Sequence, residues 1–127
     1  MLIGQLSFKT GFSRDSIRFY EKQGLIPIGS KENRFNNYKE YSEKTLQKLL
    51  TIKRMKGFGF TLKEISEFLE LLELNSATCE NVSQKMFKKV GLIDNKIKEL
   101  QEIKNLIIDG INSCQPPKKK SENCPLI

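Results

Sequence analysis

The chain has 127 residues, of which 38% are hydrophobic, and its formal net charge of +7 gives a pI near 9.4. This length allows one or two small units with a modest core, which excludes a large enzyme cavity. The basic charge favours a polyanionic partner, either nucleic acid or an acidic membrane surface. Because Lys9 and Arg14 interrupt the early apolar residues and no apolar run approaches membrane-spanning length, we expect no signal peptide and a reducing, cytoplasmic location.

The first 40 residues are divided into short elements by Gly, Ser, Asn and Pro. Residues 3–9 predict a short helix, and a turn at residues 10–12 follows it. Ser13 is a good N-cap for a second helix, which Gly24 is expected to end. The polar residues 30–37 lie between short extended segments and predict a small β-hairpin.

Two further helices are expected before residue 75. Ser42 is expected to cap the first of them, which a Gly-Phe-Gly run at residues 57–59 breaks. Thr61 and Glu64 form the pattern of a capping box, and this predicts a helix that extends through Leu72.

A long helix is predicted from Cys79, with Thr78 as its cap, to about Ser113. Its apolar seam alternates steps of four and three residues, is interrupted only by Lys104, and consists of Met86, Val90, Ile93, Ile97, Leu100, Ile107 and Ile111. A continuous helix would separate Cys79 from Cys114 by about 50 Å. An antiparallel pair of chains would instead bring Cys79 beside the partner's Cys114. The seam therefore predicts a homodimer, formed by an antiparallel coiled coil with thiols at both ends.

Two short helices joined by a Gly-containing turn, with a hairpin after the second, are typical of a winged helix-turn-helix. Arg14 and Arg18 lie four residues apart on the second helix and share a face that can enter a major groove. At the end of the hairpin, Tyr38 and Lys39 offer a hydroxyl and a cation to phosphates. Charge alone is equally compatible with a solvated basic surface on any helical protein.

The N-terminal segment resembles the MerR family of bacterial transcription regulators, whose opening pattern includes I-G, T-G, I-R-[FY]-Y-E and G-L. This chain matches it at Ile3, Gly4, Gly11, Ser13, Ile17, Arg18, Phe19, Tyr20, Glu21, Gly24 and Leu25. The end of the family's wing is matched by Tyr38, Tyr41 and Ser42, and residues 59–65 (GFTLKEI) match a later motif. The resemblance implies a mainly α fold and DNA contacts from Arg18, Tyr20, Tyr38 and Lys56. Lys39 stands where the family has arginine, so it keeps the charge but loses the bidentate fork.

The C-terminal end is similar to the metal-sensing branch of this family, in which two cysteines flank a loop before a C-P-[IL]-I tail. Here these are Cys114 and Cys124, and Cys79 stands where sensors of divalent ions have a third cysteine. Three thiolates suit Hg(II) first, then Pb(II) or, with a further ligand, Cd(II) and Zn(II). Because the chain has no histidine, a zinc site would have to recruit Glu80, Glu122 or water.

Alternative interpretations remain for these residues. Cys79 taken alone is typical of a small buried apolar side chain, and the lysines at 118–120 either offset the thiolate charge or simply solvate a loop. A thiol-redox regulator is the nearest other class, whereas three spread cysteines cannot supply the four ligands of an iron–sulfur cluster. No histidine base, nucleophile elbow or phosphate loop is present, so we expect no enzyme.

The sequence thus predicts a DNA-binding domain at residues 1–75, a dimerisation helix at residues 76–113 and a metal-binding loop and tail at residues 114–127. The family resemblance implies a bacterial cytoplasmic regulator that binds a pseudo-palindromic operator, acts with RNA polymerase and does not associate with a membrane. It implies repression in the apo form. When the thiophilic divalent ion binds, DNA distortion would activate a metal resistance or efflux promoter.

Overall fold

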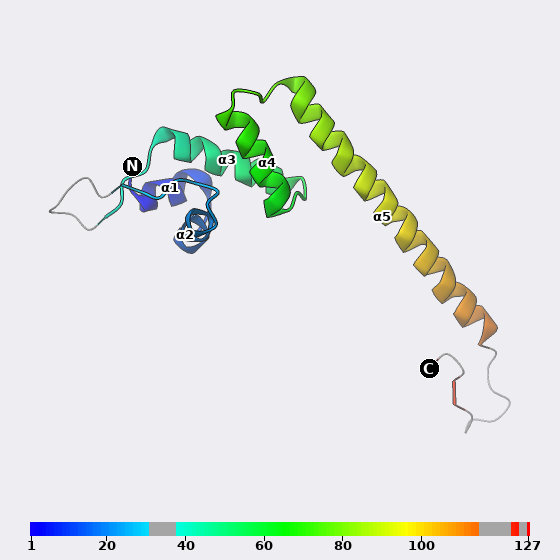
Figure 1. The fold of residues 1–127 in the computed structure, drawn as a ribbon. Coiled ribbons are helices and arrows are strands. Elements are labelled where there is room, and N and C mark those ends of the chain that lie inside the picture. Colours follow the sequence, from blue (N-terminus) through cyan, green and yellow to red (C-terminus); the bar gives the residue numbers. More distant parts are fainter. Residues whose placement is uncertain (31–37, 115–122, 125–126) are drawn as a thin grey trace. The chain divides into compact units, whose positions relative to one another are not determined.

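The computed structural model describes residues 1–30, 38–114, 123, 124 and 127. The described residues form five helices, labelled in Figure 1: α1 (Ile3–Thr10), α2 (Arg14–Lys22), α3 (Glu43–Gly57), α4 (Leu62–Glu73) and α5 (Cys79–Ser113). The mainly α class and the order of the helices are as predicted. The chain divides into two compact units, Met1–Val82 and Ser83–Ile127, so the division falls inside α5.

The predicted hairpin at residues 30–37 lies outside the described residues apart from its first position. Ser30 forms an isolated antiparallel bridge with Glu40, and each backbone N–H donates to the other residue's carbonyl, at 2.9 and 2.8 Å. The two ends of this segment are therefore joined, as a hairpin requires.

The helix starts depend on the capping residues that the sequence predicts. Ser13 and Ser42 each accept a hydrogen bond from the backbone N–H three residues further on. Thr61 and Glu64 form a reciprocal capping box, in which each side chain accepts from the other residue's backbone N–H. Thr78 accepts from the backbone N–H of residue 81 at 3.2 Å. Each contact satisfies a donor that the first helical turn leaves without an intrahelical partner.

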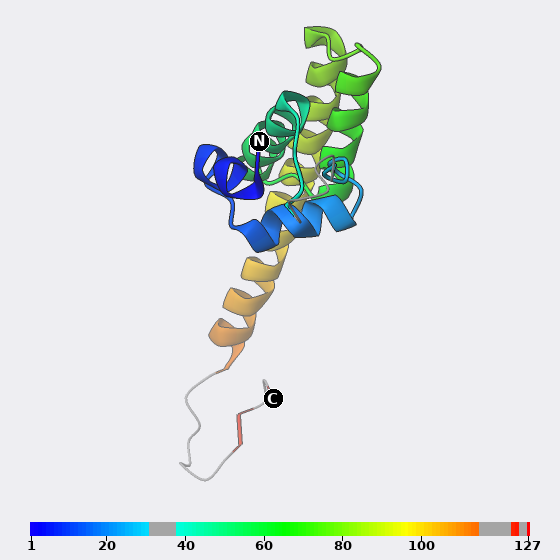
Figure 2. The ribbon, with the colours of Figure 1, turned by 90° about the vertical axis from the view of Figure 1, so that its left-hand side faces the viewer.

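The core of the first unit lies between α1, α2, α3 and α4. α1 packs against α2 and α3, and α3 packs against α4 (Figure 2). The apolar side chains with no exposed surface are Leu6, Ile17, Leu49, Ile52 and Ile65. Because Ile17 faces this core, α2 can present its opposite face outside the unit.

The turn between α1 and α2 is fixed by a lysine from α3. Gly11 has a φ of +77°, in the left-handed region that glycine adopts without steric cost. The Lys53 ammonium donates to the Thr10 carbonyl oxygen at 2.7 Å, which satisfies an acceptor at the end of α1. The Thr10 hydroxyl accepts from the Phe12 backbone N–H at 3.2 Å. These bonds fix the turn that leads into α2.

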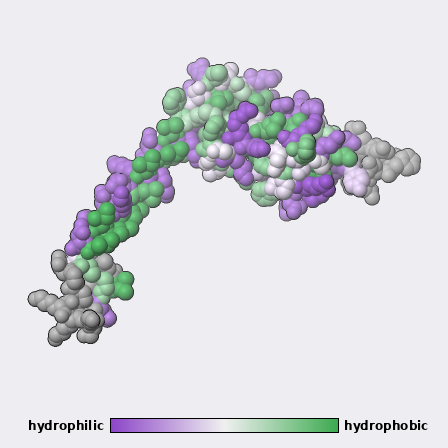
Figure 3. All heavy atoms as spheres, turned by 180° about the vertical axis from the view of Figure 1, so that it is seen from behind, coloured by the Kyte–Doolittle hydropathy of each residue, from purple (hydrophilic) through white to green (hydrophobic). Residues whose placement is uncertain are grey.

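α5 buries none of its residues within the described chain. Figure 3 shows apolar side chains gathered in a band along this helix, next to hydrophilic side chains. Ile97, in the middle of the seam, is 59% exposed, and the other seam positions from Val90 to Ile111 are similarly exposed. A helix with such a band is stable in water only when another surface covers the band, and a second copy of the same seam is complementary to it. None of the described helices is long and apolar enough to cross a membrane.

Replacement of Ile97 by aspartate should dissociate a dimer built on this seam, because pairing would bury two like charges near the two-fold axis. Sedimentation equilibrium at about micromolar concentration, the range of a moderate protein–protein affinity, should show a dimer for the wild type and a monomer for Ile97→Asp. Lys98→Asp is the matched control, because Lys98 is exposed, is not a seam position and points about 100° away from Ile97 around the helix. A monomeric wild type would contradict the pairing.

Candidate DNA interface and thiol pair

The two arginines predicted to enter the major groove are both exposed on α2. Arg18 pairs with Asp15 through Nη1 and Oδ1 at 3.3 Å, and the two side chains are 60% and 95% exposed. A pair so exposed contributes little stability, and Arg18 can exchange Asp15 for another anion. Arg14 lies against the first turn of α1, where a Cβ added to Gly4 would come within 3.0 Å of its Nη2.

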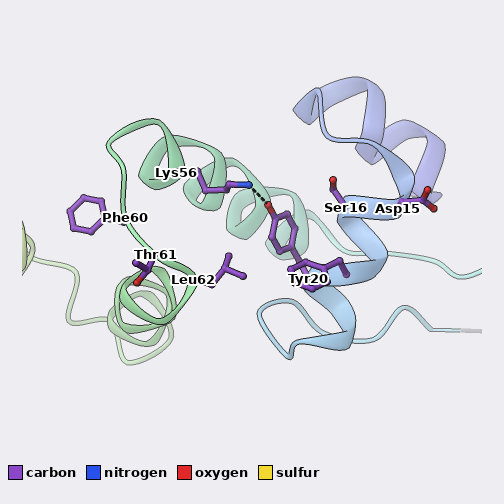
Figure 4. Close-up of a pocket in the computed structure, with 8 residues that line it drawn as sticks. Asp15, Ser16, Tyr20, Lys56, Phe60, Thr61 and Leu62 are labelled. Carbon is purple, nitrogen blue, oxygen red and sulfur yellow. Dashed lines mark hydrogen bonds between the residues drawn. The ribbon is translucent and has the colours of Figure 1, made fainter. Parts of the chain in front are cut away.

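A hollow of about 520 Å³ opens beside α2, between its outer face and the start of α4 (Figure 4). Lys56 of α3 donates to the Tyr20 hydroxyl at 3.1 Å within it. The start of α4 reaches the hollow through Thr61 and Leu62. The Lys56 ammonium favours an anion in this hollow, whereas the Asp15 carboxylate, which also lines it, opposes one.

Tyr20 lies deeper than the sequence predicts for a DNA contact. Its side chain is only 2% exposed, and its ring packs edge-on against Phe12 and Phe19 at centroid distances of 5.3 and 5.8 Å. Tyr20 is therefore part of the core of the first unit, and it also lines the hollow, where its hydroxyl accepts from Lys56. In contrast, Tyr38 is 68% exposed.

Lys39 forms an ion pair with the buried carboxylate of Glu21. Its Nζ donates to Glu21 Oε1 at 2.5 Å, and the Tyr41 hydroxyl donates to Glu21 Oε2 at 2.6 Å. Burial by itself would raise the pKa of Glu21. The hydrogen bonds from Lys39 and Tyr41, the Lys39 charge and the Gly29 backbone together hold this pKa below its ordinary value of 4.5. Burial, with the hydrogen bond to the Glu21 carboxylate and its charge, raises the pKa of Tyr41 to about 12.

Two of the three cysteines lie together. Cys114 directly follows α5, and its Sγ lies 3.5 Å from the Sγ of Cys124. The hydrogen bond between the two thiols, with burial and the Cys124 charge, raises the pKa of Cys114. Cys79 is exposed and opens α5 at its other end, about 50 Å away along a helix of this length. Within a single copy, the described residues contain no group of three ligands that could hold a metal ion.

The sequence reasoning gave no role to Glu21 and Tyr41, although both belong to the matched motifs, and it did not single out Lys53. A carboxylate at position 21 reads as a solvated helix residue because no local pattern indicates that it is buried. The only sequence feature that could have indicated this contact is the presence of Lys39 and Tyr41 in the segment that follows α2.

The geometry defines a class of protein: a helix-turn-helix DNA-binding unit followed by a long helix that needs a partner. The profile of the MerR HTH family regulatory proteins matches residues 1–72, and the MerR DNA-binding profile matches residues 46–109. The chain therefore belongs to the MerR family of transcription regulators and is not an enzyme.

Several relatives cover nearly the whole chain. It is 36% identical over 125 residues to the mercuric resistance operon regulatory protein of Bacillus cereus, covering 98% of this chain and 92% of that protein. The lead(II) complex of PbrR691 from Ralstonia metallidurans CH34 has a TM-score of 0.79 at 30% identity and covers 96% of this chain and 93% of that one. The mercury(II) complex of MerR from Bacillus megaterium MB1 has a TM-score of 0.69 at 31% identity, with coverage of 99% and 95%.

Arg18→Ala should weaken binding to a duplex selected from a randomised library by about 1–3 kcal/mol, because it removes a charged contact to DNA. The free energy of unfolding should change by less than about 1 kcal/mol, because only an exposed ion pair is lost. Fluorescence anisotropy and urea unfolding measure the two effects. Lys44→Ala is the control. Lys44 lies in the first turn of α3, about 18 Å along the helix from Lys56, which lines the hollow beside α2. Unchanged affinity for Arg18→Ala would remove this residue from the interface.

Acid should destabilise the first unit through Glu21. Because its pKa is lower in the folded chain, its contribution to stability is fully present above its unfolded pKa and is lost as the pH falls through the folded value. Urea unfolding at a series of pH values below about 5 should therefore show a loss of stability that Glu21→Gln reduces. Lys39 and Tyr41 are the charged and titratable side chains that bond to this carboxylate. An identical pH profile for Glu21→Gln would contradict this assignment.

Proposed function

We propose that this chain is a metal-responsive regulator that binds promoter DNA as a homodimer and responds to a thiophilic divalent ion. The observation that carries the proposal is the placement of the thiols at opposite ends of α5, with Cys114 and Cys124 paired and Cys79 separate. Antiparallel pairing of two copies would place each Cys114–Cys124 pair beside the partner's Cys79. The DNA-binding unit lies at the other end of the sequence.

The DNA-binding half is supported by the exposed charge and hydroxyl groups of the first unit. Arg14 and Arg18 lie on the exposed face of α2, Tyr38 is exposed, and Lys56 lies at the hollow beside α2. We infer that these four residues contact the duplex directly, with α2 in the major groove. Tyr20 supports Lys56 from the core through its hydroxyl group.

The donor set fits a soft ion. Two sulfurs bound to one ion at about 2.3 Å lie about 4 Å apart in a trigonal site, close to the 3.5 Å between Cys114 and Cys124. The bound ion would supply a link between two subunits through three thiolates. Because all three thiols must lose their protons, binding is expected to release protons and to weaken as the pH falls.

Mercury(II) is the first candidate ion, followed by lead(II) or cadmium(II) and then zinc(II). Three thiolates without histidine favour the softest of these ions. Structural relatives of similar sequence identity form complexes with mercury(II) and with lead(II), which supports a soft divalent ion without ranking the two. Titration of the reduced dimer with each ion in competition, followed by thiolate charge-transfer absorption, would rank them.

The same thiol pair supports a second candidate, a thiol-redox response, because two sulfurs 3.5 Å apart can form a disulfide without large backbone movement. In that case Cys79→Ser would respond to a hydroperoxide as the wild type does. The metal-responsive function instead requires Cys79 for every response.

A heterodimer of Cys79→Ser with Cys114→Ser tests whether ligands are shared between subunits. Neither homodimeric variant retains an intact three-thiolate site. In the heterodimer, the Cys79→Ser chain supplies Cys114 and Cys124, and the partner supplies an intact Cys79, so one complete site forms. The purified heterodimer should bind about one ion per dimer, against about two for the wild type, as three-thiolate coordination requires.

The same heterodimer contains an internal control, because its other site combines both substitutions and should bind no metal. DNA binding by the apo proteins should be equal in all variants, since neither substituted cysteine is among the residues proposed to contact DNA. A heterodimer that binds no more metal than the homodimeric variants would exclude ligand sharing across an antiparallel pair.

A further inference from the structure

Glu21 is a buried carboxylate on the helix that carries the arginines proposed to contact DNA. Among the described residues it is the one charged side chain that is buried, with 9% of its surface exposed. A buried carboxylate is costly unless other groups neutralise its charge and fill its hydrogen-bonding positions. Its position near the end of α2, three residues after Arg18, therefore requires an explanation from its partners.

Both oxygens of Glu21 bond to one short region of the chain. We call residues 29–30 and 39–41, which flank residues 31–37, the wing base. Lys39 bonds to Oε1 at 2.5 Å and Tyr41 to Oε2 at 2.6 Å, and the Gly29 backbone also bonds to this carboxylate. A single carboxylate thus attaches both arms of the wing base to α2.

The wing base is packed so closely that only glycine fits at position 29. A Cβ added there would lie 2.7 Å from the Lys39 Cβ and 2.9 Å from the Tyr41 Cζ. The bridge between Ser30 and Glu40 lies directly beside these contacts. Gly29 therefore lies against the Lys39 Cβ and the Tyr41 ring, while the Lys39 side chain, 38% exposed, reaches the carboxylate with its ammonium.

This attachment joins the two elements that carry the exposed DNA-contact candidates. Arg18 lies on α2, and its charge acts on Tyr41 across the junction. Tyr38 directly precedes Lys39 and is exposed. The Glu21 carboxylate neutralises the Lys39 ammonium, so this positive charge stabilises the contact between the wing base and α2.

We propose that Glu21 is a positioning residue for DNA binding, which fixes the wing base on α2 through Lys39 and Tyr41 so that Arg18 and Tyr38 meet one duplex together. In this arrangement Lys39 is the internal counter-ion of Glu21 and makes no phosphate contact. The inference rests on the proposed DNA-binding function and deepens it.

Salt dependence separates the two roles of Lys39. Each phosphate contact contributes about 0.9 to the slope of log affinity against log salt concentration, so a dimer that lost two lysine contacts would lose about 1.8. For Lys39→Met we expect an unchanged slope together with about tenfold weaker binding to the selected duplex, comparable to the loss of one well-placed contact. Lys39→Arg keeps the pair with Glu21 and should restore the affinity.

A double-mutant cycle then tests Glu21 itself. Glu21→Gln and Lys39→Met should each weaken binding, but the double variant should bind at least as well as Lys39→Met alone, because the unpaired buried carboxylate is gone. Lys44→Met is the matched control: it removes the same charge from the same unit without contact to Glu21, and it should bind as the wild type does. Thermal unfolding shows which variants are folded, and Tyr41→Phe replaces Glu21→Gln if that variant does not fold.

Three results would overturn the proposal. A slope reduced by about 1.8 in Lys39→Met would make Lys39 a phosphate ligand, by the same counterion count. Wild-type affinity in folded Glu21→Gln and Tyr41→Phe would show that the junction does not position the interface. Additive losses in the double variant would show that Glu21 and Lys39 act independently. If the wild type selects no sequence from the library, the DNA-binding function itself fails, which is decided before any variant is compared.

Discussion

The organisation of this protein depends on one constraint: α5 carries an apolar band, and none of its residues is buried within the described part of the chain. A 35-residue helix with a seam whose residues are about half exposed is not a stable element alone. The proposed pairing of two copies would cover the band, and an antiparallel arrangement would also bring together the thiols from the two ends of the helix. Such a dimer would carry two DNA-binding units, which recognition of a two-fold symmetric operator requires.

In the first unit, a small apolar core supports the helix that exposes Arg14 and Arg18. Ile17 anchors α2 inward, and the Lys53–Thr10 bond fixes the turn that leads into it. One basic group proposed to contact DNA is restrained by an internal contact, because Lys56 donates to the Tyr20 hydroxyl. Such preorganisation reduces the side-chain entropy that is lost when DNA binds.

The sequence correctly predicted the features that depend on residues close together in the chain, such as the helix caps. Ser13, Thr61 and Thr78 cap their helices as expected, because a capping bond joins residues only three apart. Pattern could not predict the bond from Lys56 to Tyr20 or from Lys39 to Glu21, because each joins residues 18 or more positions apart and depends on how the elements pack. The proximity of Cys114 to Cys124 was expected only from the resemblance to metal-sensing relatives. No periodicity predicts how a loop brings its two ends together.

The exposed band of α5 also has a consequence for how the regulator responds to its own abundance. Pairing is second order in chain concentration, so below the dissociation constant the number of DNA-competent pairs rises with the square of the number of chains. An unpaired chain exposes the band and is open to proteolysis and aggregation, which removes it from the pool. Promoter occupancy should therefore change more steeply than gene dosage, with a threshold set by the strength of the seam.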